Sequence, residues 1–210
     1  MKRKSLPDLP LPETLGSRRK KTLPKALSLE DITRLLEAPD LKTPIGVRDR
    51  VLMELIYGAG LRISEACSLR IEEVDLDTAS LRVTGKRGKT RRLPLPRQTM
   101  SWIESWLKEG RQMLTKRPSA FLILGARGGR LDRRTAAKRL EVHVRAAGIA
   151  AHVSPHTLRH TYAVHLLKGG ADLRVVQELL GHESITTTQV YTQLDMEEVR
   201  QRFRASHPRR

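Results

Sequence analysis

A single β-type segment interrupts a series of capped helical segments, and this feature constrains the fold most. The segment "SLRVTGKRGKTRRLPL" places short strand-like runs on both sides of a glycine-containing turn, which is typical of a hairpin. Val74 is a candidate for a third strand, within a β-type region at 72–95. The remaining apolar residues follow the helical period. The sequence therefore predicts a mainly α fold with a small antiparallel β-sheet, in the α+β class.

Capping residues mark where the helices begin and end. "SLEDITRLLEA" opens with Ser28, which has Asp31 three residues on, as in a capping box. Pro44 is predicted at the first position of the next helix, which ends near Gly58. Trp102 and Trp106 lie one turn apart and are predicted to pack in the core, with base stacking as the alternative. Four further helices are predicted at 155–168, 172–180, 184–193 and 195–205.

The N-terminal residues differ in composition from the rest of the chain. Residues 1–22 combine prolines with basic clusters and have no periodicity, which predicts a flexible basic tail or the remnant of a linker. The basic run at 18–21 is compatible both with contact to DNA phosphates and with a solvated linker end. An ordered domain is predicted over residues 23–210.

The net charge indicates a polyanionic partner. The 210 residues include 40 Lys and Arg against 23 Asp and Glu, a formal net charge of +17. Nucleic acid is the expected partner of so basic a chain, and the lack of a long apolar run disfavours a membrane. The only cysteine, Cys67, cannot form an internal disulfide and fits a reducing cytosol. It is predicted to be a buried small residue.

The segment "SPHTLRHTYAVHLLKGG" contains the first candidate site. His156 and Arg159 are three apart near a predicted helix N-terminus, where free N–H groups and the helix dipole favour an anion. His156 and His160 also have the spacing of a metal-binding pair. A zinc protease motif needs Glu directly after the first histidine, and Thr157 stands there instead, so no metal is predicted.

Three other segments carry polar residues at turns. Arg62 follows the glycine end of a helix and precedes Ser64, a predicted cap, with Glu65 placed to support the arginine. Lys86 lies in the hairpin turn, and His182 lies directly beyond the predicted end of a helix. Each signal alone also fits a solvated or structural residue.

Together with Tyr191 in "GHESITTTQVYTQL", these residues suit a phosphodiester. Arginines can neutralise the non-bridging oxygens, a lysine or histidine can protonate the leaving oxygen, and a tyrosine hydroxyl can attack phosphorus. No acidic triad for Mg²⁺ accompanies them, so no cofactor is expected.

Four sequence blocks follow one another along the chain: "GLRISEACSLR", "GKRGKTRRLPL", "SPHTLRHTYAVHLLKGGADLRVVQELLGH" and "TTTQVYTQL". With these blocks in this order, the chain resembles the tyrosine recombinases, or lambda integrase family, and among them the Xer type. The resemblance spans about residues 23–210. It implies catalytic roles for Arg62, Lys86, His156, Arg159, His182 and Tyr191.

The resemblance also implies a mechanism. Tyr191 would be the nucleophile that forms a 3′-phosphotyrosyl link, and Lys86 the general acid. His156 would assist proton transfer, and His182 would contact the phosphate. Neither ATP nor a metal would be required, because the covalent ester conserves the bond energy. The implied activity is site-specific DNA recombination of the integration or resolution type.

The expected partners follow from the same resemblance. They are double-stranded DNA, a homo- or hetero-tetramer acting on two DNA sites, and a partner recombinase or accessory protein, in a bacterial-type, nucleoid-associated cytoplasmic setting. The family's N-terminal DNA-clamping domain is expected to be absent. Additional DNA contacts are predicted for Arg87, Lys89, Arg91, Arg92, Arg133 and Arg134.

Some alternatives remain open on the sequence. Type IB topoisomerase-like DNA relaxation would use the same chemistry, and a non-catalytic DNA-binding protein would need only the basic surface. The predicted C-terminal helix is expected to pack either on a neighbouring protomer or on its own chain.

Overall fold

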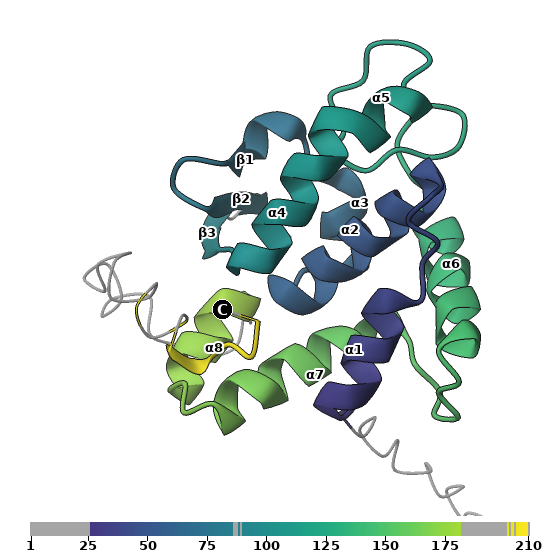
Figure 1. Ribbon diagram of the computed structural model, residues 1–210. Helices are drawn as coiled ribbons and strands as arrows, with labels where there is room; N and C mark the ends of the chain where they lie inside the picture. Colours follow the sequence, from purple (N-terminus) through teal and green to yellow (C-terminus); the bar gives the residue numbers. More distant parts are fainter. Residues whose placement is uncertain are drawn as a thin grey trace, which may run out of the picture.

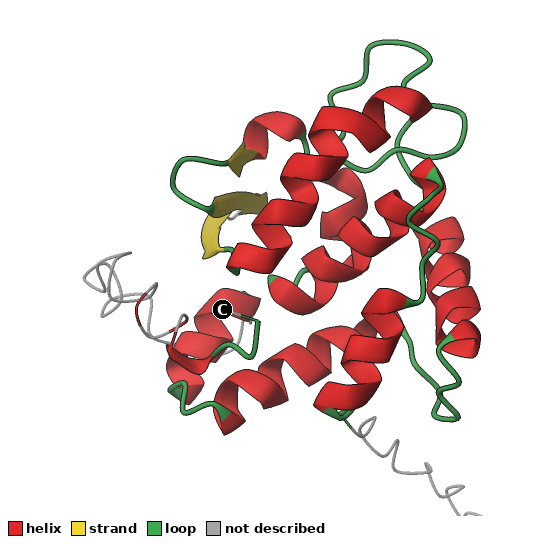
Figure 2. Cartoon of the chain, viewed as in Figure 1, coloured by secondary structure: helices red, strands yellow, loops and turns green. Residues whose placement is uncertain are grey.

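Helices make up most of the described chain, and a small sheet lies at one side (Figures 1 and 2). The computed structural model describes residues 26–85, 88, 90–181, 201, 203 and 205–209. The helices are α1 (Leu29–Glu37), α2 (Pro44–Gly58), α3 (Ile63–Ser68), α4 (Arg97–Ser105), α5 (Arg111–Leu114), α6 (Arg133–Ala146), α7 (Pro155–Lys168) and α8 (Leu173–Leu180). A 3-10 turn, η1 (Ile71–Glu73), precedes the sheet, and a π-helical turn, η3 (Trp106–Gly110), follows α4.

α2 is the central helix of the described fold. Every residue of α2 from Arg48 to Gly58 is buried, and the helix contacts α1, α3, α4, α6 and α7. This near-complete burial explains why α2 has apolar residues around most of its circumference. In the described ranges, no helix is both long enough and apolar enough to cross a membrane.

The sheet has three antiparallel strands in the order β1–β2–β3, which confirms the predicted small sheet. They are β1 (Val74–Asp75), β2 (Ser80–Thr84) and β3 (Thr90–Pro94). The pairing of Leu81 with Leu93 puts two buried side chains on the inner face, while Arg82 and Arg92 pair on the outer face. Val74 pairs with Leu81, so the prediction of a third strand is confirmed.

Several predicted helix boundaries are confirmed by local capping contacts. The Ser28 hydroxyl accepts the backbone N–H of Asp31 at 3.0 Å, and Pro44 begins α2. Ser154 caps α7 through the N–H of Thr157. Gly181 ends α8 with φ +62°, a left-handed conformation that favours glycine. The helices predicted at 184–193 and 195–205 lie largely outside the described residues.

The tryptophan pair belongs to the core, as predicted. Trp106 is fully buried, and its Nε1–H donates to the carbonyl of Leu122 at 2.9 Å. Trp102 is partly buried, and the Arg50 guanidinium lies 4.6 Å from its ring centroid. Both indoles therefore contribute to the packing of α4 and η3 against the core.

The described C-terminal residues pack on their own chain. Phe203 and His207 are buried, and the His207 ring lies 6.0 Å from the Tyr57 ring. Arg209 forms an ion pair with buried Glu54 at 2.7 Å. This packing in cis corresponds to one of the two arrangements that the sequence left open.

Candidate functional site

Three arginines from three separate elements meet at the carboxylate of Glu65. Oε1 lies 3.0 Å from Nη1 of Arg62 and 3.0 Å from Nη1 of Arg91. Oε2 accepts Nη2 of Arg91 at 3.0 Å and lies 3.7 Å from Nη1 of Arg159. Since one negative charge faces three guanidinium groups, this arginine cluster (Arg62, Arg91 and Arg159) keeps a net positive charge.

Glu65 stays ionised in this cluster. Burial raises the pKa of its carboxyl, but the hydrogen bonds from Arg91 and from the backbone N–H of Arg62 outweigh that effect and leave the pKa below its usual value. The predicted support of Arg62 by Glu65 is therefore confirmed.

The backbone before α3 holds Arg62 in place. Gly60 has φ +63°, and a Cβ there would lie 2.5 Å from the Tyr162 ring. The N-cap of α3 is Arg62, whose backbone N–H donates to Glu65 Oε2 at 2.9 Å. The prediction that Ser64 is the cap is wrong, because the glutamate three residues after Arg62 supplies the capping oxygen and Ser64 lies inside the helix.

Arg159 is the buried member of the cluster. Its Nη1 donates to the carbonyl of Gly60, and its Nη2 donates to the carbonyl of Leu180. Burial, together with the nearby charge of Arg62, lowers the pKa of Arg159 to about 10. The guanidinium remains protonated at neutral pH, so a fixed cation lies beside the more open Arg62, whose side chain is 43% exposed.

The three arginines also bind the C-terminal end of α8. Arg91 Nε donates to the carbonyl of Leu179 at 3.1 Å, and Arg62 Nη2 donates to the carbonyl of Gly181 at 3.3 Å. Arg159 Nη2 donates to the carbonyl of Leu180, which lies between those two residues in the chain. Carbonyls at a helix C-terminus lack intrahelical donors and carry partial negative charge, which cations stabilise. The cluster therefore fixes the end of α8, one residue before His182.

His156 occupies the second position of α7 and is exposed, one turn before Arg159. Its helix N-terminus is capped by Ser154, as predicted. Within the part of the chain that the structure describes, no three His, Cys, Asp or Glu side chains come together as metal ligands would.

Several predicted site residues lie outside the described residues, and their roles remain predictions. They are Lys86, Arg87, Lys89, His182 and Tyr191.

The remaining predicted DNA contacts occupy different environments. Arg91 is half-buried, and its N–H groups donate hydrogen bonds to the Glu65 carboxylate and to a backbone carbonyl of α8. Arg92 lies on the outer face of the sheet, where Asp75, Ser80 and Thr78 accept its hydrogen bonds. Arg133 and Arg134 are exposed in the first turn of α6, and no described hydrogen bond or ion pair joins them to the arginine cluster.

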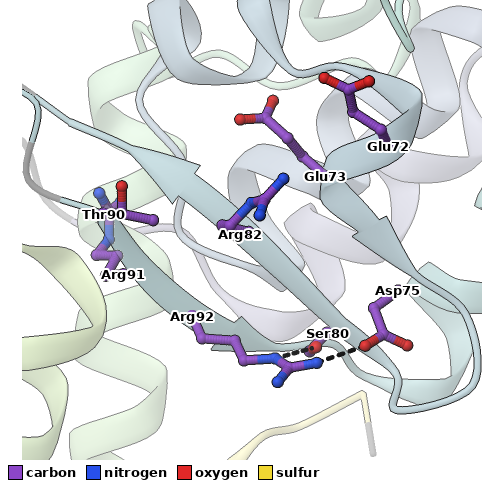
Figure 3. Close-up of a pocket in the computed structure, with 8 residues that line it drawn as sticks. All are labelled: Glu72, Glu73, Asp75, Ser80, Arg82, Thr90, Arg91 and Arg92. Carbon is purple, nitrogen blue, oxygen red and sulfur yellow. Dashed lines mark hydrogen bonds and ion pairs between the residues drawn. The ribbon is translucent and has the colours of Figure 1, made fainter.

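A hollow of about 430 Å³ lies beside the outer face of the sheet (Figure 3). It is lined by Glu72, Glu73, Asp75, Ser80, Arg82, Thr90, Arg91 and Arg92. Three carboxylates and three guanidinium groups line this hollow, so their charges balance. The arginine cluster instead has an excess of positive charge.

Two of the chain's three tyrosines are core residues. Tyr57 is fully buried, as predicted, and its hydroxyl lies 2.9 Å from Nδ1 of His165. Tyr162 is also buried. Burial raises the pKa of Tyr57 to about 12 and also raises the pKa of Tyr162, so neither hydroxyl is suited to attack a phosphate. Cys67 is buried as predicted, and burial raises its pKa to about 11.

Sequence reasoning missed the position of Arg91. The sequence predicts a DNA contact for this residue because it lies in a basic hairpin. Its partner, Glu65, is 26 residues away along the chain, and no local spacing links the two. Strand alternation was the available signal, since Arg91 and Arg92 must face opposite sides of the sheet.

The chain matches the profile of the phage integrase family over residues 25–198. The chain is 42% identical over 214 residues to tyrosine recombinase XerC of Myxococcus xanthus, covering all of this chain and 71% of that protein. It is 46% identical over 190 residues to tyrosine recombinase XerD of Pseudomonas putida, covering 90% of this chain and 64% of that protein. The chain therefore belongs to the tyrosine recombinases.

Solved structures agree with this assignment. The crystal structure of XerA recombinase superposes with a TM-score of 0.70 at 31% identity, covering 90% of this chain and 67% of that one. XerH site-specific recombinase bound to its difH substrate, in a pre-cleavage complex, gives a TM-score of 0.69 at 29% identity. That match covers 86% of this chain and 54% of XerH.

Proposed function

We propose that this chain cleaves and rejoins DNA in site-specific recombination, through a covalent tyrosine intermediate. The observation that carries the proposal is the arginine cluster, in which three guanidinium groups face one carboxylate at the end of α8. A fixed, preorganised positive charge is what a phosphodiester transition state needs. Family membership and the DNA-bound XerH relative support DNA as the substrate.

Each proposed residue has a distinct role in the reaction. Arg62 and Arg159 bind the non-bridging oxygens of the scissile phosphate, with Arg62 as the accessible donor and Arg159 as the fixed one. Tyr191 attacks phosphorus and forms the 3′-phosphotyrosyl bond, while the 5′ oxygen leaves with a proton from Lys86. His156 assists proton transfer at the N-terminus of α7, and His182 donates to the phosphate.

The assignment of Tyr191 as the nucleophile has independent support. The chain has three tyrosines, and the hydroxyls of Tyr57 and Tyr162 are enclosed in the core. The chain continues toward Tyr191 from Gly181, whose carbonyl accepts a hydrogen bond from Arg62.

Partners and surroundings follow from the proposed reaction. Residues 23–210 form the catalytic domain, and residues 1–22 are a basic tail or linker. Recombination joins two DNA sites, so we propose a homo- or hetero-tetramer on DNA, with a partner recombinase or accessory protein, in the bacterial cytoplasm at the nucleoid. Arg87, Lys89, Arg92, Arg133 and Arg134 add phosphate contacts around the site.

The test is covalent trapping in EDTA. Supercoiled plasmid carrying candidate core sites is incubated with wild-type protein or Tyr191→Phe and stopped with SDS. Adduct with the wild type only, together with products joining two sites, is the expected result. Relaxed plasmid without joined products would indicate topoisomerase activity alone. DNA binding with no adduct in either protein would contradict the proposed chemistry.

A further inference from the structure

We infer that Arg91 is a positioning residue for the catalytic arginines and does not itself contact DNA. This inference rests on the proposed function for its kinetic consequences. It departs from the role expected of a basic hairpin residue, and the contacts of the Arg91 guanidinium are its basis.

The contact between Arg91 and Glu65 is bidentate. Nη1 donates to Oε1 and Nη2 donates to Oε2, each at 3.0 Å. The side chain of Arg91 is 15% exposed and that of Glu65 is 6% exposed. This paired geometry needs the planar fork of arginine, which a lysine ammonium cannot reproduce.

Arg91 joins the same carboxylate to the end of α8. Its Nε donates to the carbonyl of Leu179 at 3.1 Å. A Cβ at Gly181 would lie 3.3 Å from the Arg91 guanidinium carbon, so the side chain packs directly against the helix end. One guanidinium thus ties together β3, α3 and α8.

This connection determines how much charge the other arginines can offer a phosphate. With Arg91 in place, both oxygens of Glu65 already accept hydrogen bonds, and Arg159 stays 3.7 Å away. Without Arg91, the carboxylate would accept further donors from Arg62 or Arg159 and draw them from the phosphate position. The end of α8, which precedes His182, would also lose one of its three arginine contacts.

Arg92 provides the contrast on the same strand. It faces the outer side of the sheet and is 46% exposed, with its ion-pair partner Asp75 near the surface. Arg92 makes three hydrogen bonds of its own, to Ser80, Thr78 and Asp75 on this outer face. The three hydrogen bonds of Arg91 instead go to Glu65 and Leu179 inside the protein, so only Arg92 is open enough to contact a DNA phosphate.

The experiment compares Arg91→Lys, Arg91→Gln and Arg92→Gln. Single-turnover adduct formation is measured at saturating DNA, at a temperature where circular dichroism shows every variant folded. DNA affinity is measured across salt concentrations. We expect both Arg91 variants to lose about 10- to 100-fold in rate, with unchanged affinity and salt dependence. Arg92→Gln should instead weaken binding and reduce the salt slope by about 1.

A double variant separates positioning from a general loss of stability. If Arg91 acts through Glu65, the rate of Glu65→Gln should fall little further when Arg91→Gln is added. Multiplying losses would contradict the inference, as would wild-type rate in Arg91→Lys. Weaker binding and a reduced salt slope at a normal rate would also overturn it, while leaving the proposed function intact.

Hydrogen exchange of the free protein gives a readout that does not depend on activity. Faster exchange over residues 173–181 in both Arg91 variants is the expected result, with Arg92→Gln exchanging like the wild type there. Unchanged exchange in this segment would overturn the inference. If the wild type formed no DNA adduct, the proposed function would fail, and this exchange comparison would still decide whether Arg91 fixes the end of α8.

Discussion

The carboxylate of Glu65 lies between Arg62 and Arg91, with Oε1 3.0 Å from a guanidinium nitrogen of each. Arg62 is the more open of the two arginines and Arg91 the more enclosed. The buried Arg91 therefore holds the Glu65 carboxylate in place, and the carboxylate in turn orients the accessible Arg62.

Replacing Glu65 with Gln should destabilise the fold strongly. The change leaves three guanidinium groups without their shared carboxylate, and breaking a buried ion pair typically costs about 3–5 kcal/mol. Urea unfolding measures the loss. Glu72→Gln is the control, because Glu72 forms an exposed ion pair with Arg70 and should change stability by less than about 1 kcal/mol. Equal effects would show that the buried carboxylate has no special role.

Arg159→Lys should nearly abolish DNA cleavage while retaining the charge. A lysine ammonium cannot reach the carbonyls of Gly60 and Leu180 together and still present a fork to phosphate. Losing one preorganised donor typically costs about 10²–10³ in rate. Single-turnover adduct formation provides the measurement. Arg139→Lys, which alters the ion pair between Arg139 of α6 and Asp49 of α2, should leave the rate unchanged. A normal rate in Arg159→Lys would refute the assigned role.

Gly169→Ala should displace the C-terminal segment from the core. A Cβ at this position would lie 2.0 Å from the backbone oxygen of Ser206, so the two backbones could not keep their present approach. Limited proteolysis should cut the C-terminal residues faster in this variant. Gly129→Ala is the matched control, since a Cβ there meets nothing within 4 Å. Equal protection in both variants would mean that this close approach is unimportant.

The free energy of unfolding should decrease as the pH is lowered, and His207 should account for part of this decrease. Burial, together with the nearby charge of Arg209, lowers the pKa of His207 to about 3. Between this value and the ordinary histidine pKa, the unfolded chain binds a proton that the folded chain does not, so acid favours unfolding. The contribution lost between pH 7 and pH 5 is about 2 kcal/mol.

Urea unfolding of the wild type and His207→Gln at both pH values tests that contribution. His165, whose pKa burial also lowers, is present in both proteins, so the difference between them isolates His207. The wild type should lose more stability than the variant on acidification. Parallel losses would place the pH sensitivity elsewhere.

The features that the sequence predicted correctly depend on residues close together in the chain. Ser28, Pro44 and Ser154 begin helices through contacts within three residues. The hairpin is similarly local, because its turn and alternation lie within one segment.

Features that depend on distant residues could not be predicted in this way. Ser64 is a better intrinsic cap than Arg62, yet Glu65 caps the helix and at the same time binds arginines from β3 and α7. Local rules describe one helix end at a time. They do not show that three carbonyls at the end of α8 are shared among three arginines.

The most direct measurement is to identify the amino acid that carries DNA in the covalent adduct. The SDS-trapped adduct formed in EDTA is digested with nuclease and trypsin, and the peptide bearing residual nucleotide is sequenced by mass spectrometry. We predict that the nucleotide is attached through a 3′-phosphate to Tyr191 and that Tyr191→Phe yields no such peptide. Attachment to any other residue, or an adduct that persists in Tyr191→Phe, would contradict the proposed mechanism.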